Sequence, residues 1–270
     1  MGELEGKVVI ITGSNSGIGK ATAKLLIQEG AKVVINGRND EKLNNAEKEI
    51  NAPEGKLLKV RADITKPEQA KQLIDKTIEK FGKLDILINN AGVSMRGNFA
   101  ELSPEVFETV FGINVFGVAN TTVPAMEHIR KTKGSIIFIS SAAGIRGLPG
   151  TSAYCSSKMA LRALAESIRI EESKAGIHVG LIYVGITKNE KGKTTIAADG
   201  SLKELKDRSN FKVHTPERVA KAVVNNIKRR KFIKTLSGMA KINKVMQALF
   251  PGLVEFTLIK SLKKIEERNN

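Results

Sequence analysis

The chain has 270 residues, of which 41% are hydrophobic and 27% charged, a composition typical of globular proteins and not of disordered ones. The formal net charge is +16, but aromatic residues make up only 4% and there is no tryptophan, so we expect no nucleic-acid partner. No run approaches 18 consecutive apolar residues, so we expect no membrane-spanning helix. Cys155 is the only cysteine, so no internal disulfide is expected. The N-terminus lacks a signal-peptide pattern, and together these features lead us to expect a cytoplasmic protein.

Short β-branched runs alternate with stretches of helical period along most of the chain. Strands are expected at 7–13, 32–37, 57–60, 84–90, 135–140 and 178–185, and helices at 18–30 and 67–82 and after Ser103-Pro104 and Thr215-Pro216. The apolar runs are continuous, as in strands buried on both faces. The sequence therefore predicts an α/β fold, a three-layer, doubly wound parallel sheet of Rossmann type in a single domain (1–238), with a helical extension at 239–270.

The stretch TGSNSGIG (12–19) lies between the first expected strand and the first expected helix. Its glycines Gly13, Gly17 and Gly19 permit a tight turn and a close approach of backbone to phosphate. The start of a helix adds free N–H groups and the positive end of the helix dipole. This loop is therefore predicted to bind the pyrophosphate of a dinucleotide.

Tyr154 and Lys158 are four residues apart in an expected helix, so their side chains share one face. A phenol has a pKa near 10, and a neighbouring ammonium favours the phenolate, which allows proton exchange with a substrate oxygen near neutral pH. Ser141 ends the fifth expected strand, and its hydroxyl can hold a carbonyl oxygen. We expect Ser141, Tyr154 and Lys158 to be catalytic, with Ser141 and Tyr154 touching the substrate.

These motifs, together with NNAG at 89–92, resemble the short-chain dehydrogenase/reductase family over residues 6 to about 230. The resemblance implies hydride transfer between a nicotinamide cofactor and a ketone or secondary alcohol, in a homodimer or homotetramer. It also implies that Asn114, in GINVFG, is the fourth catalytic residue and supports a proton relay to Lys158. The residues that the resemblance places at the cofactor are Gly13, Ser14, Ser16, Gly17, Ile18, Gly19, Arg38, Asn39, Asp63, Ile64, Asn90, Ala91, Gly92, Tyr154, Lys158, Gly185, Thr187 and Asn189.

The end of the second strand favours NADP(H) over NAD(H). Gly37 stands where an NAD site usually has an acid, and Arg38 follows, which suits a 2′-phosphate. NAD(H) remains the alternative, because Ser16 stands where some NADP-binding relatives have a basic residue and Asp40 is close by in the chain. Asn189 stands where the family has a threonine, and it can still hydrogen-bond the nicotinamide carboxamide.

Two regions depart from the strand–helix alternation. Residues 186–214 are polar and irregular, too long for an ordinary connection, and follow the carboxyl end of a strand, so we interpret them as a mobile substrate lid. Tyr183, just before them, is expected either under the nicotinamide or in the substrate pocket. In the basic extension 239–270, apolar residues recur at helical spacing, Pro251-Gly252 interrupts them and a second apolar helix follows. Pocket cover, subunit packing and peripheral contact with an anionic membrane all remain open for it.

The substrate and the function class keep alternatives. The extension loosely resembles that of hydroxysteroid- and retinol-dehydrogenase-like reductases, which suggests a lipophilic small molecule. A 3-oxoacyl-[acyl-carrier-protein] reductase is the alternative enzyme, and a non-catalytic cofactor-sensing or membrane-surface binding protein is the alternative of another class. The acidic carrier of such a reductase could dock on Arg130, Lys131, Lys133, Arg162 and Arg169. The three histidines are scattered without metal-ligand spacing, so no metal is expected.

Overall fold

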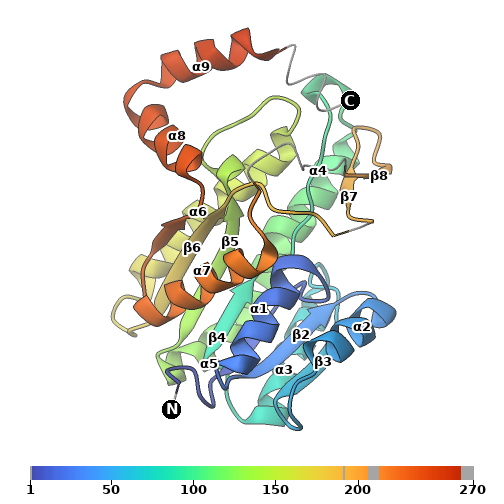
Figure 1. Ribbon diagram of the computed structural model, residues 1–270, viewed down its shortest axis with the longest axis vertical. Coiled ribbons are helices and arrows are strands. Elements are labelled where there is room, and N and C mark those ends of the chain that lie inside the picture. Colours follow the sequence, from blue (N-terminus) through green and yellow to red (C-terminus); the bar gives the residue numbers. More distant parts are fainter. Residues whose placement is uncertain (1, 191, 206–212, 263–270) are drawn as a thin grey trace.

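The computed structural model describes residues 2–190, 192–205 and 213–262 and has a seven-stranded parallel sheet at its centre (Figure 1). The strand order is β3-β2-β1-β4-β5-β6-β9, the order of a doubly wound Rossmann sheet with one strand added at its edge. The predicted fold class is confirmed. The strands are β1 (Val8–Ile11), β2 (Lys32–Gly37), β3 (Leu57–Arg61), β4 (Ile86–Asn89), β5 (Ser135–Ser141), β6 (His178–Val184) and β9 (Ile233–Thr235).

Helices cover both faces of the sheet because neighbouring residues of each strand point to opposite sides. In β1, Val9 and Ile11 enter a core with helices α1, α2 and α7, whereas Ile10 enters the core that α3, α5 and α6 share. The first layer is α1 (Gly17–Gln28), α2 (Asp40–Ile50) and α7 (Pro216–Arg229), and the second is α3 (Pro67–Phe81), α5 (Gly117–Thr132) and α6 (Ser152–Glu171). Thr215 caps α7, accepting from the Arg218 N–H at 3.2 Å.

A long helical run combines α4 (Pro104–Phe111), a π-helical turn η2 (Gly112–Phe116) and α5. Among the described residues, this run alone is long and apolar enough, by length and composition, to cross a membrane. Its inward residues Val118, Ala125 and Ile129 are buried in the core shared with the sheet, so packing within the fold accounts for its apolar character. Ser103 precedes α4 as expected, but its side chain makes no capping hydrogen bond. Short 3₁₀ turns lie at η1 (Phe99–Glu101) and η3 (Ala142–Gly144).

The expected lid is more regular than predicted. It contains a hairpin of β7 (Thr194–Ile196) and β8 (Leu202–Glu204), turned at Asp199-Gly200, a pair that favours tight turns. The hairpin is attached to the body by a bridge between Met95 and Ile196. Residues 191 and 206–212 of the lid lie outside the described residues.

The C-terminal extension forms two helices that continue from β9, as predicted. They are α8 (Gly238–Leu249) and α9 (Pro251–Lys260), and Figure 1 shows them standing away from the body beyond one end of the sheet. Eight of the large apolar side chains in this extension are more than half exposed, from 54% to 74%. These are Met239, Ile242, Val245, Leu249, Phe250, Leu253, Phe256 and Ile259. Residues 263–270 of the predicted extension lie outside the described residues.

Candidate active site

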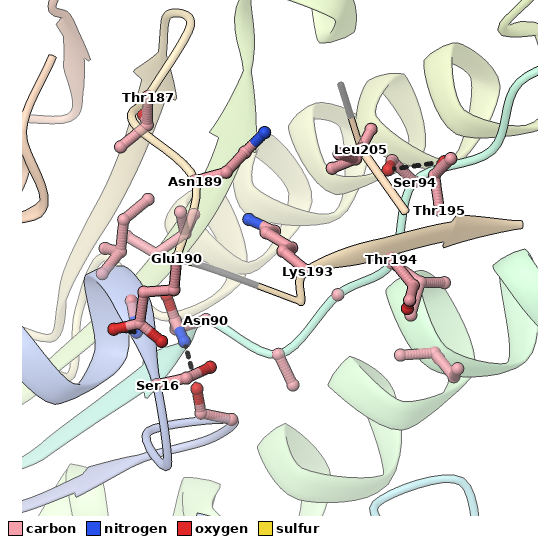
Figure 2. A pocket seen from close by; sticks show the side chains of 18 of the residues that line it. Ser16, Asn90, Ser94, Thr187, Asn189, Glu190, Lys193, Thr194, Thr195 and Leu205 are labelled. Atoms are coloured by element: carbon pink, nitrogen blue, oxygen red, sulfur yellow. Dashed lines mark hydrogen bonds between the residues drawn. The ribbon is translucent and has the colours of Figure 1, made fainter. Parts of the chain in front are cut away.

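A cavity of about 1320 Å³ opens where the parallel strands end at their carboxyl edge. Figure 2 shows part of it, with side chains from the glycine loop, the strand ends and the lid pointing into one space. It is large enough for a dinucleotide and a substrate together. Of the predicted site residues, those that line it are Gly13, Ser16, Gly17, Ile18, Arg38, Asn39, Asp63, Ile64, Asn90, Ala91, Gly92, Ser141, Tyr154, Lys158, Gly185, Thr187 and Asn189.

Three predicted residues, Ser14, Gly19 and Asn114, lie behind the cavity wall. Ser14 is fully buried, and its hydroxyl donates to the Ile11 carbonyl at 2.7 Å. Gly19 lets the loop pack closely, because a Cβ there would lie 2.6 Å from Asn90 Nδ2 and 2.7 Å from the Gly13 carbonyl oxygen. The loop conformation itself needs Gly13, whose φ is +61°.

The glycine loop is fixed to the end of β4 by polar side chains. Thr12 Oγ1 accepts from the backbone N–H groups of Asn90 and Ala91, both at 3.0 Å. Asn90 Nδ2 donates to the carbonyls of Thr12 and Gly13, both at 2.9 Å. Asn90 therefore shapes the glycine loop as well as lining the cavity. The buried Asn36, at the end of β2, also holds this loop, because its Oδ1 accepts from the Gly13 N–H at 3.4 Å. No site role was predicted for Thr12 or Asn36 from the sequence, although a polar residue at the end of an apolar strand is a usable signal.

The predicted catalytic side chains meet at the end of β5 and the start of α6. Lys158 Nζ is 6.0 Å from the centre of the Tyr154 ring and donates to the Ile139 carbonyl at 3.1 Å. Ser141 faces the same cavity, and its Oγ accepts from the Ala143 N–H at 3.2 Å. Ser140 instead donates to the backbone carbonyl of Lys158 at 3.0 Å, so it holds α6 against the sheet.

The Lys158 ammonium has an unusual environment. Burial, and to a smaller extent the positive charge of Lys193 on the lid, lower its pKa from 10.5 to about 8. The lysine is still largely charged at neutral pH, but close enough to its pKa to respond to a change of environment. An ammonium at this position favours the Tyr154 phenolate.

Asn114 lies in the π-helical turn between α4 and α5, a type of irregularity that often marks functional sites. It is fully buried, and its amide accepts from the Val93 N–H at 2.8 Å and donates at 3.0 Å to the Val93 carbonyl and to Ser157 Oγ. Gly92 lies between Asn114 and Lys158, since a Cβ there would be 3.0 Å from Asn114 Oδ1 and 3.1 Å from Lys158 Nζ. Asn114 thus holds the loop after β4 against α6, the helix that carries Tyr154 and Lys158.

Arg38 lines the cavity, and its guanidinium is 3.7 Å from the Asp63 carboxylate. Burial raises the pKa of Asp63, but hydrogen bonds from Thr65 and the charge of Arg38 outweigh it, so the pKa is lowered. Asp40, which could have served as the ribose acid, is 3.3 Å from Arg61 and does not line the cavity. The cation, and not that acid, therefore faces the cavity here.

Gly185, Thr187 and Asn189, from the segment after β6, also line the cavity. Asn189 Nδ2 is buried and has no hydrogen-bond partner among the described residues, as expected of a donor that serves a bound group.

Tyr183 is neither under a nicotinamide nor in the pocket. Tyr183 is 1% exposed and packs in the core between the sheet and α6. Neighbouring residues of a strand point to opposite faces, so Val184 lines the cavity and Tyr183 points away from it.

A family profile described as short chain dehydrogenase matches residues 7–199, which is more than two thirds of the chain. The chain belongs to the short-chain dehydrogenase/reductase family. It is an oxidoreductase that acts on CH–OH groups with NAD(P). The site fits such a cofactor, because the glycine loop (12–19, the glycine cradle) leads into α1 and the buried Asn189 Nδ2 has no hydrogen-bond partner among the described residues. Among the described residues, no group of three or more His, Cys, Asp or Glu could hold a metal ion.

Individual members are similar over most of the chain. An uncharacterized oxidoreductase of Thermotoga maritima is 38% identical over 74% of this chain and 80% of its own length. Dehydrogenase/reductase SDR family member 7B of Bos taurus is 32% identical over 97% of this chain and 83% of its own.

Two solved structures have the same architecture. A 3-ketoacyl-(acyl-carrier-protein) reductase from Brucella melitensis, complexed with NADH, has a TM-score of 0.77 and 26% identity, covering 87% of this chain and 98% of that one. An alcohol dehydrogenase from Thermococcus sibiricus, complexed with 5-hydroxy-NADP, has a TM-score of 0.72 and 25% identity, covering 86% of this chain and 95% of that one.

Proposed function

We propose that the protein is an NADP(H)-dependent enzyme that transfers hydride between nicotinamide and an apolar ketone or secondary alcohol. The observation that carries the proposal is the convergence of Ser141, Tyr154 and Lys158 on the cavity that begins at the glycine cradle. A bound nicotinamide would supply or accept the hydride. The residues of the chain supply the proton, the orientation and the exclusion of water.

In the direction of reduction, Ser141 Oγ and the Tyr154 hydroxyl hold the carbonyl oxygen, and the phenol donates its proton as negative charge develops there. Lys158 lowers the free energy of the resulting phenolate because its ammonium is buried on the same helix face, near the Tyr154 ring. Asn114 keeps this helix and the loop after β4 in register. In oxidation the phenolate takes the proton back.

Arg38 supports the choice of NADP(H). Its side chain is 62% exposed at the cavity, so it can turn from Asp63 toward a 2′-phosphate and pair with it through two donors. Arg38→Asp should shift the ratio of kcat/KM for NADPH over NADH toward NADH. Lys59→Asp is the matched control, since Lys59 does not line the cavity. An unchanged ratio in Arg38→Asp would contradict the cofactor assignment.

The apolar part of the cavity wall supports a lipophilic substrate. Small and aliphatic side chains line it, among them Val93, Leu148, Ala198 and Leu205. The direct test is a panel of ketones and alcohols of graded hydrophobicity, followed by nicotinamide absorbance with both cofactors. We expect kcat/KM to rise with hydrophobicity, and a preference for charged, polar carbonyls would contradict the substrate class.

The alternative of a 3-oxoacyl-[acyl-carrier-protein] reductase has less support. Most of the cations that could dock an acidic carrier are engaged within the chain, with Arg130 paired to Glu172, Lys131 to Glu127 and Arg162 to Glu166. A carrier-linked 3-oxoacyl group turned over much faster than a free ketone would favour this alternative. A non-catalytic binding role lacks support, because Ser141, Tyr154 and Lys158 all face one cavity.

We also propose a homo-oligomer, homodimer or homotetramer, in the cytoplasm. Phe116 and Val123 lie on the helical run through α5, and at 61% and 71% exposure they form a face that a second copy could cover. Size-exclusion chromatography with light scattering tests this, and a monomer for the native chain would contradict it.

Peripheral contact with an anionic membrane is the assignment we propose for α8 and α9. Their exposed apolar side chains are accompanied by Lys241, Lys244 and Lys260, the composition of an interfacial helix. Co-sedimentation with phosphatidylserine-containing vesicles should be lost in Phe256→Asp and kept in Ile170→Asp, a control at an equally apolar exposed site elsewhere. Equal binding by both variants, or none by the native chain, would contradict the assignment.

A further inference from the structure

The carboxylate of Glu190, in the lid, rests on the first turn of α1 inside the cavity. Its Oε1 accepts from the Gly17 N–H at 2.9 Å and lies 3.4 Å from Lys20 Nζ. Lys20 in turn donates to Glu49 at 2.7 Å. Figure 2 shows Glu190 and Ser16 on the same side of the cavity, where the lid comes close to the glycine loop. A lid residue therefore contacts the backbone that the sequence predicts to bind phosphate.

The start of α1 attracts an anion because no side chain of the helix itself accepts hydrogen bonds from the backbone N–H groups of its first turn. The N-cap residue Ser16 makes no side-chain capping bond, and the first turn has no acidic residue. By contrast, α2 is capped by Asn39 and has Asp40 and Glu41 in its first turn. Free N–H groups and the positive dipole end at α1 thus remain for another partner.

Lys20 strengthens the attraction. Burial lowers its pKa, but the hydrogen bond to Glu49 and the negative charges of Glu190 and Glu49 outweigh this, so the pKa is raised and the side chain stays charged. Its ammonium lies between the two carboxylates. Glu190 therefore has two favourable partners on α1, a backbone N–H and a cation.

A dinucleotide pyrophosphate would bind to the same N–H groups, since this is how a glycine loop at a helix start holds phosphate. Two anions cannot occupy one position, and like charges repel at this distance. We propose that the Glu190 carboxylate competes with the cofactor within the chain. It occupies the phosphate position in the cofactor-free protein and must leave that position when the dinucleotide binds. Glu190 therefore lowers the affinity for dinucleotide. This inference rests on the proposed function of the cavity as a dinucleotide site.

The position of Glu190 in the chain extends the effect to the lid. On one side the chain is tied to the body by Lys188 N–H, which donates to the His214 carbonyl at 2.9 Å, and on the other by Ile196 N–H, which donates to the Ser94 carbonyl at 2.9 Å. Lys193 lies between these ties and donates its N–H to the Glu190 carbonyl at 3.2 Å. The Lys193 carbonyl also accepts from the Leu205 N–H at 2.8 Å, so Glu190 is linked through Lys193, whose charge acts on Lys158, to the lid hairpin.

The test compares dissociation constants for NADPH and NADH, measured by nicotinamide fluorescence, in the native chain, Glu190→Gln and Glu190→Ala. We expect Glu190→Ala to bind about 3- to 10-fold more tightly, the size of a charge interaction at a helix end, with a smaller gain for Glu190→Gln. Glu204→Gln is the matched control, because Glu204 is a lid carboxylate that accepts from the Gly192 N–H at 3.0 Å, within the lid itself. ADP should show the same gain in Glu190→Ala, and adenosine, which has no phosphate, should show none.

Hydrogen exchange provides a second measurement. The N–H groups at the start of α1, in peptides covering residues 13–20, should exchange faster in cofactor-free Glu190→Ala than in the native chain. Saturating NADPH should remove that difference. Unchanged or weaker cofactor binding in Glu190→Ala would overturn this inference while leaving the proposed function intact. Failure of the native chain and all variants to bind either dinucleotide would overturn both.

Discussion

Replacing Asn114 by alanine tests how α6, the helix that carries Tyr154 and Lys158, is positioned. Asn114 is fully buried and its amide makes hydrogen bonds to the Val93 N–H, the Val93 carbonyl and Ser157 Oγ. Truncation removes the partner of the Val93 N–H and of the Val93 carbonyl, whereas Ser157 Oγ keeps its hydrogen bond to the Tyr154 carbonyl at 2.8 Å. Each buried unsatisfied group costs about 1–3 kcal/mol, part of which relaxation recovers. We therefore expect the free energy of unfolding to fall by about 2–4 kcal/mol in urea denaturation at pH 7.

Asn120→Ala is the matched control, since Asn120 lies in the same helical run and makes a single hydrogen bond, to the Ile64 carbonyl at 2.9 Å. It should lose only about 1 kcal/mol. Asn114→Ala should also lower kcat while leaving the dissociation constant for NADPH within about twofold, because Asn114 lies behind the cofactor cavity. If Asn114→Ala destabilises the chain no more than Asn120→Ala, the positioning role assigned to its hydrogen bonds is wrong.

The other predictions concern pH and the glycine cradle. Because the pKa of Lys158 is about 8 in the native protein, kcat/KM for carbonyl reduction should fall above about pH 8; a flat profile to pH 10 would contradict the environment described for this lysine. Lys158 in the unfolded chain has a pKa near 10.5, so between about pH 8 and 10.5 the unfolded state binds a proton that the native state lacks. The free energy of unfolding should therefore rise with pH between about 8 and 10.5, and this gain is absent below about pH 8. Lys158→Met should remove this rise in unfolding free energy. If the unfolding free energies of the native chain and of Lys158→Met change with pH in the same way across this range, the lowered pKa of Lys158 is wrong. Gly19→Ala should abolish measurable NADPH binding because its Cβ would meet Asn90 and the Gly13 carbonyl, whereas Gly238→Ala, in open space, should bind normally; retained binding in Gly19→Ala would show that the cradle tolerates a side chain.

Local sequence pattern was sufficient to predict the central sheet. Continuous β-branched runs such as 7–13 and 135–140 mark strands buried on both faces, and parallel pairing follows from the intervening helices. The short edge strand β9 and the hairpin β7–β8 were missed, because three-residue strands leave too few residues for a periodic signal. Their pairing depends on contacts far away in the chain, such as that of Ile196 with Met95.

The candidate site was predictable where chemistry depends on chain spacing, as for Tyr154 and Lys158 on one helix face. It was not predictable where the role depends on which way a side chain turns. Ser14 and Tyr183 point into the interior, away from the cavity, although each adjoins a residue that faces it. The contact of Glu190 with Gly17 joins residues far apart in sequence, and no local pattern marks it.

The most direct test of the central claim is the rate of carbonyl reduction by Tyr154→Phe, with Tyr183→Phe as the control. The chain has only these two tyrosines, and Tyr183 is a core residue away from the cavity. On a ketone that the native chain reduces with NADPH, Tyr154→Phe should lose at least about 100-fold in kcat, the usual contribution of a general acid, with NADPH binding retained and Tyr183→Phe close to native. A kcat for Tyr154→Phe within a few-fold of native would show that Tyr154 is not the proton donor.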